Sequence, residues 1–216
     1  VLARAESTVS SLSSLLGGLV EKFAARGYSL YLVGGSVRDA LLGRLGNDLD
    51  FTTPARPEVV KEILDEWAET VWDTGIDFGT VSAAYKGQQI EITTFRSDSY
   101  DGQSRNPEVV YGDTLEGDLV RRDFKANAMA IELLADASFK FHDPLHGLQD
   151  IADRVLDTPD KPEISFHDDP LRMLRAARFA SQLEFRVADR VVEAMRDMAG
   201  EIQRITVERV QVELDK

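Results

Sequence analysis

The sequence predicts an α+β domain, a mixed sheet with helices, followed by an all-helical domain. Strand-like and helical segments alternate through the first part of the chain, whereas only helical periodicity remains after Pro159 and Pro162. The 216 residues, 43% of them hydrophobic, are enough for one core of ordinary size or for a larger and a smaller domain. We therefore expect domains over residues 1–153 and 154–216, with a boundary near Arg154.

Local patterns predict the elements of the first domain. Apolar residues at helical spacing predict an amphipathic helix over residues 6–26 that ends at Gly27. An apolar strand over 28–33 leads into Gly34-Gly35, and Ser36 can cap a short helix ending near Gly43. The next segments are a strand over 48–53, a helix over 56–71 with Pro57 in its first turn, and a hairpin over 79–95 that turns at Lys86-Gly87.

The later segments are simpler. Residues 96–118 are rich in Gly, Asp, Ser and Asn, which is typical of a long loop. A strand-like run over 139–144 closes the first domain, and residues 146–155 predict a connecting helix. Residues 169–183, 188–198 and 206–216 are helical, with no strand signal left.

Composition and charge limit the function. No apolar run is long enough to cross a membrane, no export signature is visible, and the absence of cysteine excludes disulfides and thiolate zinc sites. The cytoplasm is therefore the expected compartment. The net charge of -13 is unusual for a nucleic-acid binder, so such binding needs a local arginine cluster or a basic surface outside this chain.

Asp48 and Asp50 are two residues apart on a predicted strand, so their carboxylates point to the same face. Magnesium prefers oxygen ligands, and a metal shared by two carboxylates and a triphosphate is typical of nucleotidyl transfer. The alternative is a solvated strand end. Glu91, which alternates with Ile90 and Ile92, is a candidate third carboxylate or else an exposed acid on a sheet.

Gly34 and Gly35 follow a strand and precede a short helix, where backbone amides can approach a phosphate closely. Arg38 could pair with that phosphate. Alternatively the turn is an ordinary one, and Arg38 is solvated or bridged to Asp39. Adjacency to the two aspartates favours the phosphate site.

Two further groups combine arginines with an acid. Arg121, Arg122, Asp123 and Asn127 suit a triphosphate or a ribose hydroxyl, unless Asp123 forms a structural salt bridge with either arginine. The second group, spaced by three on a predicted helix, is Asp169, Arg172, Arg175 and Arg178. Asp169 and Arg172 could read the edge of a base, whereas the alternative is a surface helix with ion pairs.

His142, His146 and His167 are assigned no chemistry. His142-Asp143 and His167-Asp168 spell a dipeptide found in metal phosphohydrolases, but the remaining ligands of such a site are missing. Each histidine is more often a loop or packing residue.

Six strings occur in one order: LVGGSVRDALLGRLGNDLDFTT, IEITTFR, RRDFKANAMAI, DPLHGLQD, DDPLRMLRAARF and VERVQVEL. Together they resemble the class II tRNA nucleotidyltransferases, which comprise the CCA-adding enzymes and their bacterial poly(A) polymerase relatives. Each string is modest alone, but six in the family's order over residues 28–214 make a specific match. The resemblance implies a head domain of the DNA polymerase beta type followed by a helical neck.

The resemblance also implies roles for these residues. Asp48 and Asp50 would hold two magnesium ions, with Glu91 as a further candidate, and the triphosphate would lie on Gly34, Gly35 and Arg38. Arg122, Asp123 and Asn127 would contact the sugar and phosphates. Asp169 and Arg172 would select the base, and Arg175 and Arg178 are further nucleotide-binding candidates. Residues 97–117 match a loop used in moving between C and A addition, and Gly147 and Asp150 match a hinge.

The sequence departs from the family pattern at two points. Asp168-Asp169 stands where Glu-Asp is usual, and Lys125 stands where threonine is usual. The body and tail domains that hold tRNA in the family have no counterpart before Lys216, so we expect a fragment.

Our main hypothesis is the transfer of CMP and AMP from CTP and ATP to the 3′ end of tRNA, with magnesium and with no membrane or protein partner implied. Poly(A) addition, or addition of only C or only A, is the closest alternative. A non-catalytic nucleotide- or RNA-binding fragment and a metal phosphohydrolase are alternatives from other classes.

Overall fold

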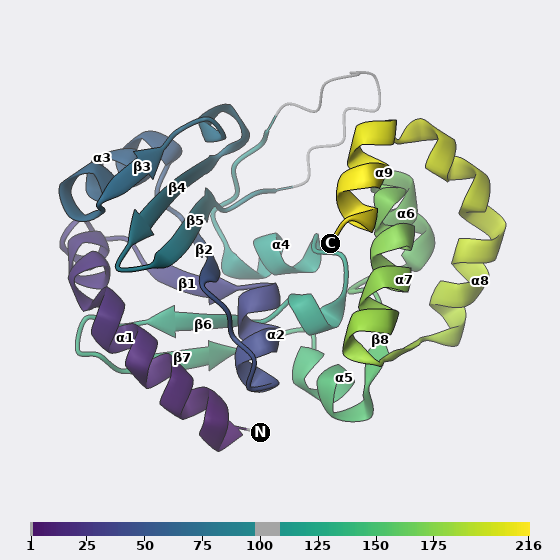
Figure 1. The fold of residues 1–216 in the computed structure, drawn as a ribbon, viewed down its shortest axis with the longest axis horizontal. Helices are drawn as coiled ribbons and strands as arrows, with labels where there is room; N and C mark the ends of the chain where they lie inside the picture. The colour runs from purple at the N-terminus through teal and green to yellow at the C-terminus, as the bar shows by residue number, and fades with distance from the viewer. Residues whose placement is uncertain (1, 98–108) are drawn as a thin grey trace. The chain divides into compact units, whose positions relative to one another are not determined.

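The computed structural model describes residues 2–97 and 109–216. Within them one seven-stranded sheet has the order β3 (Thr70–Trp72), β4 (Thr80–Tyr85), β5 (Gln88–Thr94), β2 (Asp48–Thr53), β1 (Leu30–Val33), β6 (Ala130–Leu133) and β7 (Phe139–His142) (Figure 1). β2 and β5 are parallel, and the other neighbouring pairs in this sheet are antiparallel. The predicted mixed sheet is confirmed.

The helices that accompany this sheet in the described residues are α1 (Leu2–Ala25), α2 (Gly35–Leu41), α3 (Pro57–Trp67) and α4 (Leu115–Val120), with a 3-10 turn η1 (Ile76–Phe78). α1 confirms the predicted amphipathic helix and begins earlier, at Leu2. α3 ends at Trp67 rather than at the predicted Val71, because residues 70–72 pair with β4. β-Branched and aromatic residues favour that pairing. None of the described helices is long and apolar enough to cross a membrane.

The faces of β2, β4 and β5 differ in polarity. Along each strand, buried apolar residues alternate with more exposed polar ones, and the buried set comprises Leu49, Phe51, Val81, Ala83, Ile90 and Ile92. α3 packs on β4 and β5 and buries Val60, Ile63 and Leu64. One face of these strands therefore belongs to the core, and the opposite face is polar.

The turn between β4 and β5 confirms the predicted hairpin. Lys86 and Gly87 have φ values of 44° and 79°, as a two-residue type I′ turn requires. Glycine adopts such an angle at little cost, which suits the second position of this turn.

The chain divides into two compact units, residues 1–119 with 129–143 and residues 120–128 with 144–216. In the described part of the second unit, the helices are η2 (Lys125–Asn127), α5 (Gly147–Asp153), α6 (Pro162–Asp168), α7 (Leu171–Leu183), α8 (Asp189–Met198), η3 (Ala199–Arg204) and α9 (Val207–Leu214). The core of this unit includes Phe166, Met173 and Val191.

The expected absence of strands after Pro159 is wrong. β8 (Val155–Leu156) and β9 (Arg186–Val187) form a short parallel pair in the second unit. Two residues are too few for a periodic pattern, and the pairing joins positions that are far apart in the chain. α6 likewise has only seven residues and was not expected.

The division between the units differs from the boundary expected near Arg154. η2 belongs to the second unit, where Lys125 Nζ lies 3.5 Å from Asp150 and 3.2 Å from Asp157. The Lys125 amide also donates to the Asp157 carbonyl at 2.9 Å. These contacts join residues 120–128 to the helices that follow Pro144.

Candidate active site

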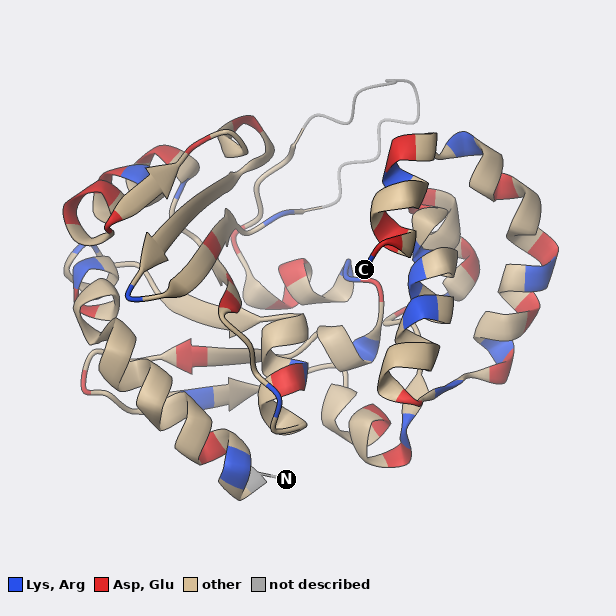
Figure 2. Cartoon of the chain, in the orientation of Figure 1, with Lys and Arg blue, Asp and Glu red and all other residues tan. Residues whose placement is uncertain are grey.

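Three carboxylates, from strands β2 and β5, lie on the polar face of the sheet in the first unit. Figure 2 marks acidic positions on these strands in red. On β2, exposed Asp48 and Asp50 alternate with buried Leu49 and Phe51. Asp50 lies opposite Glu91 in the parallel β2–β5 pair, and residues paired in this way point to the same face. Glu91 therefore lies beside the two aspartates.

These acids line a pocket of about 460 Å³, a volume typical of small-molecule sites. Ser82, Gln89 and Trp72 contribute to the same wall. Ser82 Oγ donates to Glu91 Oε1 at 3.5 Å, so the acid is held toward β4. The pocket lies entirely on elements of the first unit.

The donor set fits magnesium, because carboxylate oxygens are the hard ligands that this ion prefers. Among residues 2–97 and 109–216, however, no group of three or more His, Asp or Glu side chains is arranged to hold a metal ion. Asp48 and Asp50 would therefore bind magnesium together with water and phosphate oxygens, as is common for magnesium in nucleotide sites. A ligand role for Glu91 stays a prediction.

The Gly34-Gly35 turn leads directly from β1 into α2. Gly34 has φ 66° and ψ -137°, a backbone conformation that is essentially restricted to glycine. Ser36 was expected to cap α2, and this is wrong, because α2 begins at Gly35 and Gly34 takes the cap position. Ser36 Oγ instead accepts a hydrogen bond from the Asp50 amide at 3.0 Å. The turn is thereby tied to the strand that carries the aspartates.

Arg38 adopts one of the two arrangements left open by the sequence. Its side chain is buried, and its Nε donates to Asp39 Oδ1 at 2.9 Å. The guanidinium also lies close to the glycine turn, since a Cβ added to Gly35 would be 3.2 Å from Arg38 Nη2. Pairing with a phosphate stays a prediction.

In the second unit, Asp123 is buried and fully hydrogen-bonded. Its Oδ1 accepts from the Phe124 amide at 2.8 Å and from Asn127 Nδ2 at 3.0 Å, and its Oδ2 accepts from Arg175 Nε at 2.8 Å. Arg175 Nη2 lies 2.7 Å from the same oxygen, as part of the ion pair. Burial opposes ionisation, but the charge of Arg175 and these hydrogen bonds outweigh it and lower the pKa of Asp123. The structural salt bridge thus exists with Arg175, whereas the sequence suggested Arg121 or Arg122.

Asp169 and Arg172 engage different partners within the second unit. Asp169 is the C-cap of α6 and not a residue of α7, which corrects the expected four-residue series on one helix. Its carboxylate pairs with Arg209 at 2.9 Å. Arg172 donates to Ser165 Oγ at 2.9 Å and to the Arg121 carbonyl at 2.8 Å.

Arg175 and Arg178 lie on α7, where Figure 2 shows several basic positions. Arg178 Nε donates to Glu213 Oε1 at 2.5 Å, and Arg175 Nη1 lies 3.7 Å from Glu213 Oε2. Both guanidinium groups also lie over the ring of Phe179, at 5.2 and 4.3 Å. The ion pairs of this helix therefore connect separate helices rather than successive turns. Arg122 is half-buried in the same unit.

The three histidines and Asp150 make contacts within the fold. His142 Nε2 lies 3.0 Å from Glu132, His146 is the left-handed residue before α5, and the carbonyl of His167 accepts from Arg204. Burial raises the pKa of Asp150, which also faces Lys125. Most of the expected loop over 97–117 lies outside the described residues.

Sequence reasoning missed Trp72, Ser82 and Glu213. Trp72 follows directly on the predicted helix over residues 56–71 and was assigned to no element, although Thr70, Val71 and Trp72 all favour strands. Ser82 could have been found from its alternation with Val81 and Ala83. Glu213 carries no local signal, because its partners lie on another helix.

Residues 30–157 match the family profile described as Poly A polymerase head domain, and residues 184–216 match the one described as Probable RNA and SrmB-binding site of polymerase A. A CCA-adding enzyme of Lactobacillus helveticus (strain DPC 4571) is 42% identical over 191 residues, which cover 88% of this chain and 46% of that protein. The chain spans about half the length of the curated relatives it matches.

Solved structures agree with this match. The CCA-adding enzyme of Bacillus stearothermophilus in complex with CTP is 37% identical with a TM-score of 0.81, covering 94% of this chain and 47% of that one. A tRNA nucleotidyltransferase complexed with a primer tRNA and an incoming ATP analog is 29% identical with a TM-score of 0.77, covering 91% and 55%. The mixed sheet is thus that of a nucleotidyltransferase head. The chain belongs to the poly A polymerase head domain family.

Proposed function

We propose that this chain is the head and neck portion of a CCA-adding enzyme, which transfers CMP and AMP from CTP and ATP to the 3′ end of tRNA. The observation that carries the proposal is the set of Asp48, Asp50 and Glu91 on the polar face of a head-domain sheet. Relatives at 40 to 42% identity that are named CCA-adding enzymes support the choice of substrates.

In the proposed reaction the 3′ hydroxyl of the tRNA attacks the α-phosphate in line and pyrophosphate leaves, with no covalent bond to the protein. Two magnesium ions held by Asp48 and Asp50 would lower the pKa of the hydroxyl and neutralise charge on the leaving oxygens. The aspartates can bind ions without disturbing the core, because Leu49 and Phe51 fix the strand from its other face.

The Gly34-Gly35 turn and Arg38 are assigned to the triphosphate. The absence of side chains at the turn lets phosphate oxygens approach the backbone amides. Arg38 would replace part of its contact with Asp39 by a phosphate, which is the stronger partner for a planar guanidinium. Ser36 keeps this turn in register with Asp50.

The second unit is assigned to the helical neck that selects the base. Three hydrogen bonds and an ion pair with Arg175 occupy the oxygens of Asp123. We therefore assign Asp123 to holding Asn127 and Arg175 in place, with Arg122 and Asn127 toward the sugar and phosphates. Asp169 and Arg172 would recognise C or A by giving up their present contacts with Arg209 and Ser165 and pairing with the edge of the base. Guanine or uracil would then lose a pairing, at about 1 to 3 kcal/mol each.

The test is incubation of the chain with magnesium, CTP, ATP and tRNA that lacks its terminal CCA, followed by sequencing of the 3′ ends. Restored CCA ends support the proposal. Long A tracts, or addition of C or A alone, would refute the proposed specificity for CCA but would still support nucleotidyl transfer. Asp48→Asn with Asp50→Asn should abolish transfer, whereas Asp136→Asn, an exposed acid in the β6–β7 turn, is the matched control.

A non-catalytic nucleotide- or RNA-binding role is the alternative from another class, favoured by the net charge of -13 and by the coverage of about half of the relatives. Magnesium-dependent CTP and ATP binding that survives replacement of both aspartates by alanine would favour it. A phosphohydrolase would instead lose activity on replacement of His142, His146 or His167. The transferase should be unaffected by those replacements.

A further inference from the structure

Trp72 lies at the end of a row of side chains that crosses four strands. Trp72 on β3 pairs with Ser82 on β4, Ser82 pairs with Glu91 on β5, and Glu91 pairs with Asp50 on β2. Residues that are paired in register project from the same face of a sheet. The indole therefore shares the polar face with the carboxylates, and it lines the same pocket.

Most of the side chains that line the pocket with Trp72 are polar. Thr74, Ser82 and Gln89 line this pocket with the acids, and the tryptophan is 42% exposed. Because this large aromatic ring is partly exposed to water at the edge of the pocket, it contributes little to the hydrophobic core of its own unit. An aromatic face of this kind suits a flat ligand that is apolar on its faces and polar at its edges, as a nucleobase is.

The distance along the row identifies which part of a substrate could reach this ring. Three strand spacings of about 4.8 Å place Trp72 about 14 Å from Asp50. A stacked nucleic-acid strand advances about 3.4 Å per nucleotide, so this span corresponds to about four nucleotides, or fewer in an extended strand. The 3′ hydroxyl would lie at Asp50, with the preceding nucleotides running toward β3.

We propose that Trp72 is a stacking platform for one base among the last few nucleotides of the RNA acceptor. This assignment rests on the proposed function, because it takes the 3′ hydroxyl to be placed at Asp50. The ring binds any base through its π-face, which lets it hold the acceptor end while that end changes sequence during addition. Trp72 is thus a binding residue for the acceptor rather than for the incoming nucleotide.

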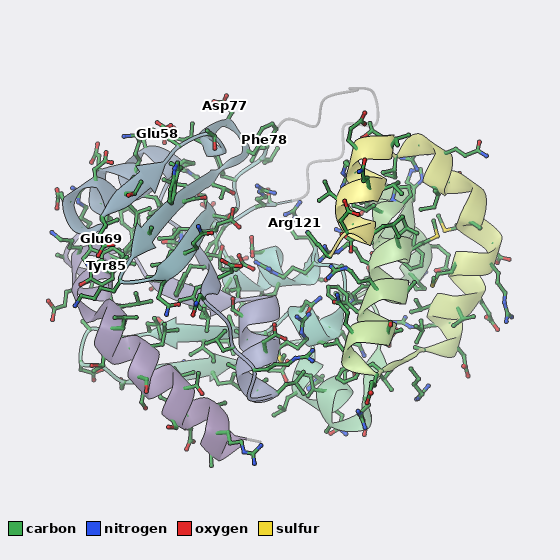
Figure 3. The ribbon with its side chains drawn as sticks, in the orientation of Figure 1. Glu58, Glu69, Asp77, Phe78, Tyr85 and Arg121 are labelled. Atoms are coloured by element: carbon green, nitrogen blue, oxygen red, sulfur yellow. The ribbon has the colours of Figure 1, made fainter. Side chains whose placement is uncertain are left out.

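Trp67 provides an internal comparison. It stacks on Tyr85, labelled in Figure 3, with ring centroids 3.9 Å apart, and its indole lies against Gly18 of α1. Tyr85 alternates with Ala84 on β4 and so belongs to the face opposite Ser82. The protein has two tryptophans, one on each face of the sheet.

The experiment measures tryptophan fluorescence of Trp67→Phe and Trp72→Phe, each of which retains a single indole. A short single-stranded RNA with a free 3′ hydroxyl should quench Trp67→Phe and leave Trp72→Phe unchanged. Abasic substitutions walked back from the 3′ end should remove the quenching at one position among the last few nucleotides. Quenching of both variants, of neither, or by CTP or ATP alone to the same extent would overturn the proposal.

Kinetics give a second readout. Trp72→Ala should raise the KM for the tRNA acceptor about tenfold, within a range of about 5- to 150-fold for loss of one stacked base, and leave the KM for CTP unchanged. Trp72→Tyr should restore most of the affinity, and Thr70→Ala on the same strand is the control. An unchanged acceptor KM would overturn the assignment. Absence of transfer by the unmodified chain would instead refute the proposed function, while the fluorescence test still reports on Trp72.

Discussion

Replacement of Asp123 by asparagine tests whether Asp123 positions Asn127 and Arg175 or contacts the nucleotide directly. The substitution preserves shape and keeps one oxygen for the Phe124 amide and Asn127. The new NH2 group, however, faces two nitrogens of Arg175: Nε, which now donates to Oδ2 at 2.8 Å, and Nη2, which lies 2.7 Å from the same oxygen. The charge-assisted hydrogen bond from Nε and the ion pair are lost, and the NH2 group of asparagine faces the N–H donors of Arg175.

The expected cost is about 3 kcal/mol. A hydrogen bond to a charged group contributes about 1.5 to 3 kcal/mol, and breaking a buried ion pair typically costs about 3 to 5 kcal/mol. We take the lower end, because the Arg175 side chain is 29% exposed and can turn toward Glu213, 3.7 Å away. Asp123→Asn should therefore weaken the second unit substantially without unfolding the first.

The pH dependence has a defined sign. The pKa of Asp123 is lowered in the folded chain, so the folded state binds its proton less tightly than the unfolded state. The stability from this pair is therefore fully present above the ordinary carboxyl pKa of about 4 and is lost as the pH falls through the lower folded value. The difference between the unmodified chain and Asp123→Asn should be constant near neutrality and shrink in acid.

Hydrogen exchange of the α7 amides is the appropriate assay, since both tryptophans lie in the first unit and fluorescence reports on that unit alone. Loss of about 3 kcal/mol corresponds to exchange faster by about two orders of magnitude. The double variant with Arg175→Met should recover part of the loss, which measures the coupling. A change below about 1 kcal/mol combined with weaker CTP binding would refute our reasoning and favour direct contact with nucleotide.

Three further substitutions and one treatment test other parts of the structure. Asp50→Asn should lower transfer by a factor of about 10² to 10³ with unchanged thermal unfolding, since its carboxylate is exposed. Gly34→Ala should cost about 1 to 3 kcal/mol in urea unfolding, because φ is 66°. Asp150→Asn should be neutral or stabilising at neutral pH, because burial raises the pKa of Asp150 and its ionised form opposes folding; the difference should vanish in acid. Chelation of magnesium should stop transfer and leave circular dichroism unchanged, since packed apolar residues hold β2.

Strands and helices in which buried apolar residues recur at regular spacing could be predicted from the sequence. β2, β4 and β5 have one buried face, and burial of every second residue is what produces the alternating pattern. α1 buries one stripe of a long helix, which gives a repeat that local reasoning recognises. The hairpin between β4 and β5 could be predicted because Lys86-Gly87 suits a two-residue turn between two alternating strands.

Short elements were not predictable, because distant partners create them. β3 exists through pairing with β4, and β8 exists only beside β9. Residues 70–72 continue the polar and apolar pattern of α3, so the end of that helix is decided by the edge of the sheet and not by its own sequence.

In the candidate site, too, local features could be predicted and contacts between distant residues could not. Asp48 and Asp50 were found because two nearby residues suffice to place them on one face. The partners of the second unit are remote in sequence: Asp123 and Arg175 are 52 residues apart, Asp169 and Arg209 are 40 apart, and Arg178 and Glu213 are 35 apart. Charge alone does not choose among many acids and bases at such separations, so the pairing needs the fold.

The alternation of β2, β4 and β5 has a consequence for protein engineering. Residues that face the pocket and residues that hold the fold occupy alternate codons, so a combinatorial library can randomise one set without touching the other. A library that varies Ser82 and Gln89 and keeps the buried residues Val81, Ala83 and Ile90 should change substrate preference with little effect on folding. The sheet thus makes the evolution of specificity separable from the preservation of stability.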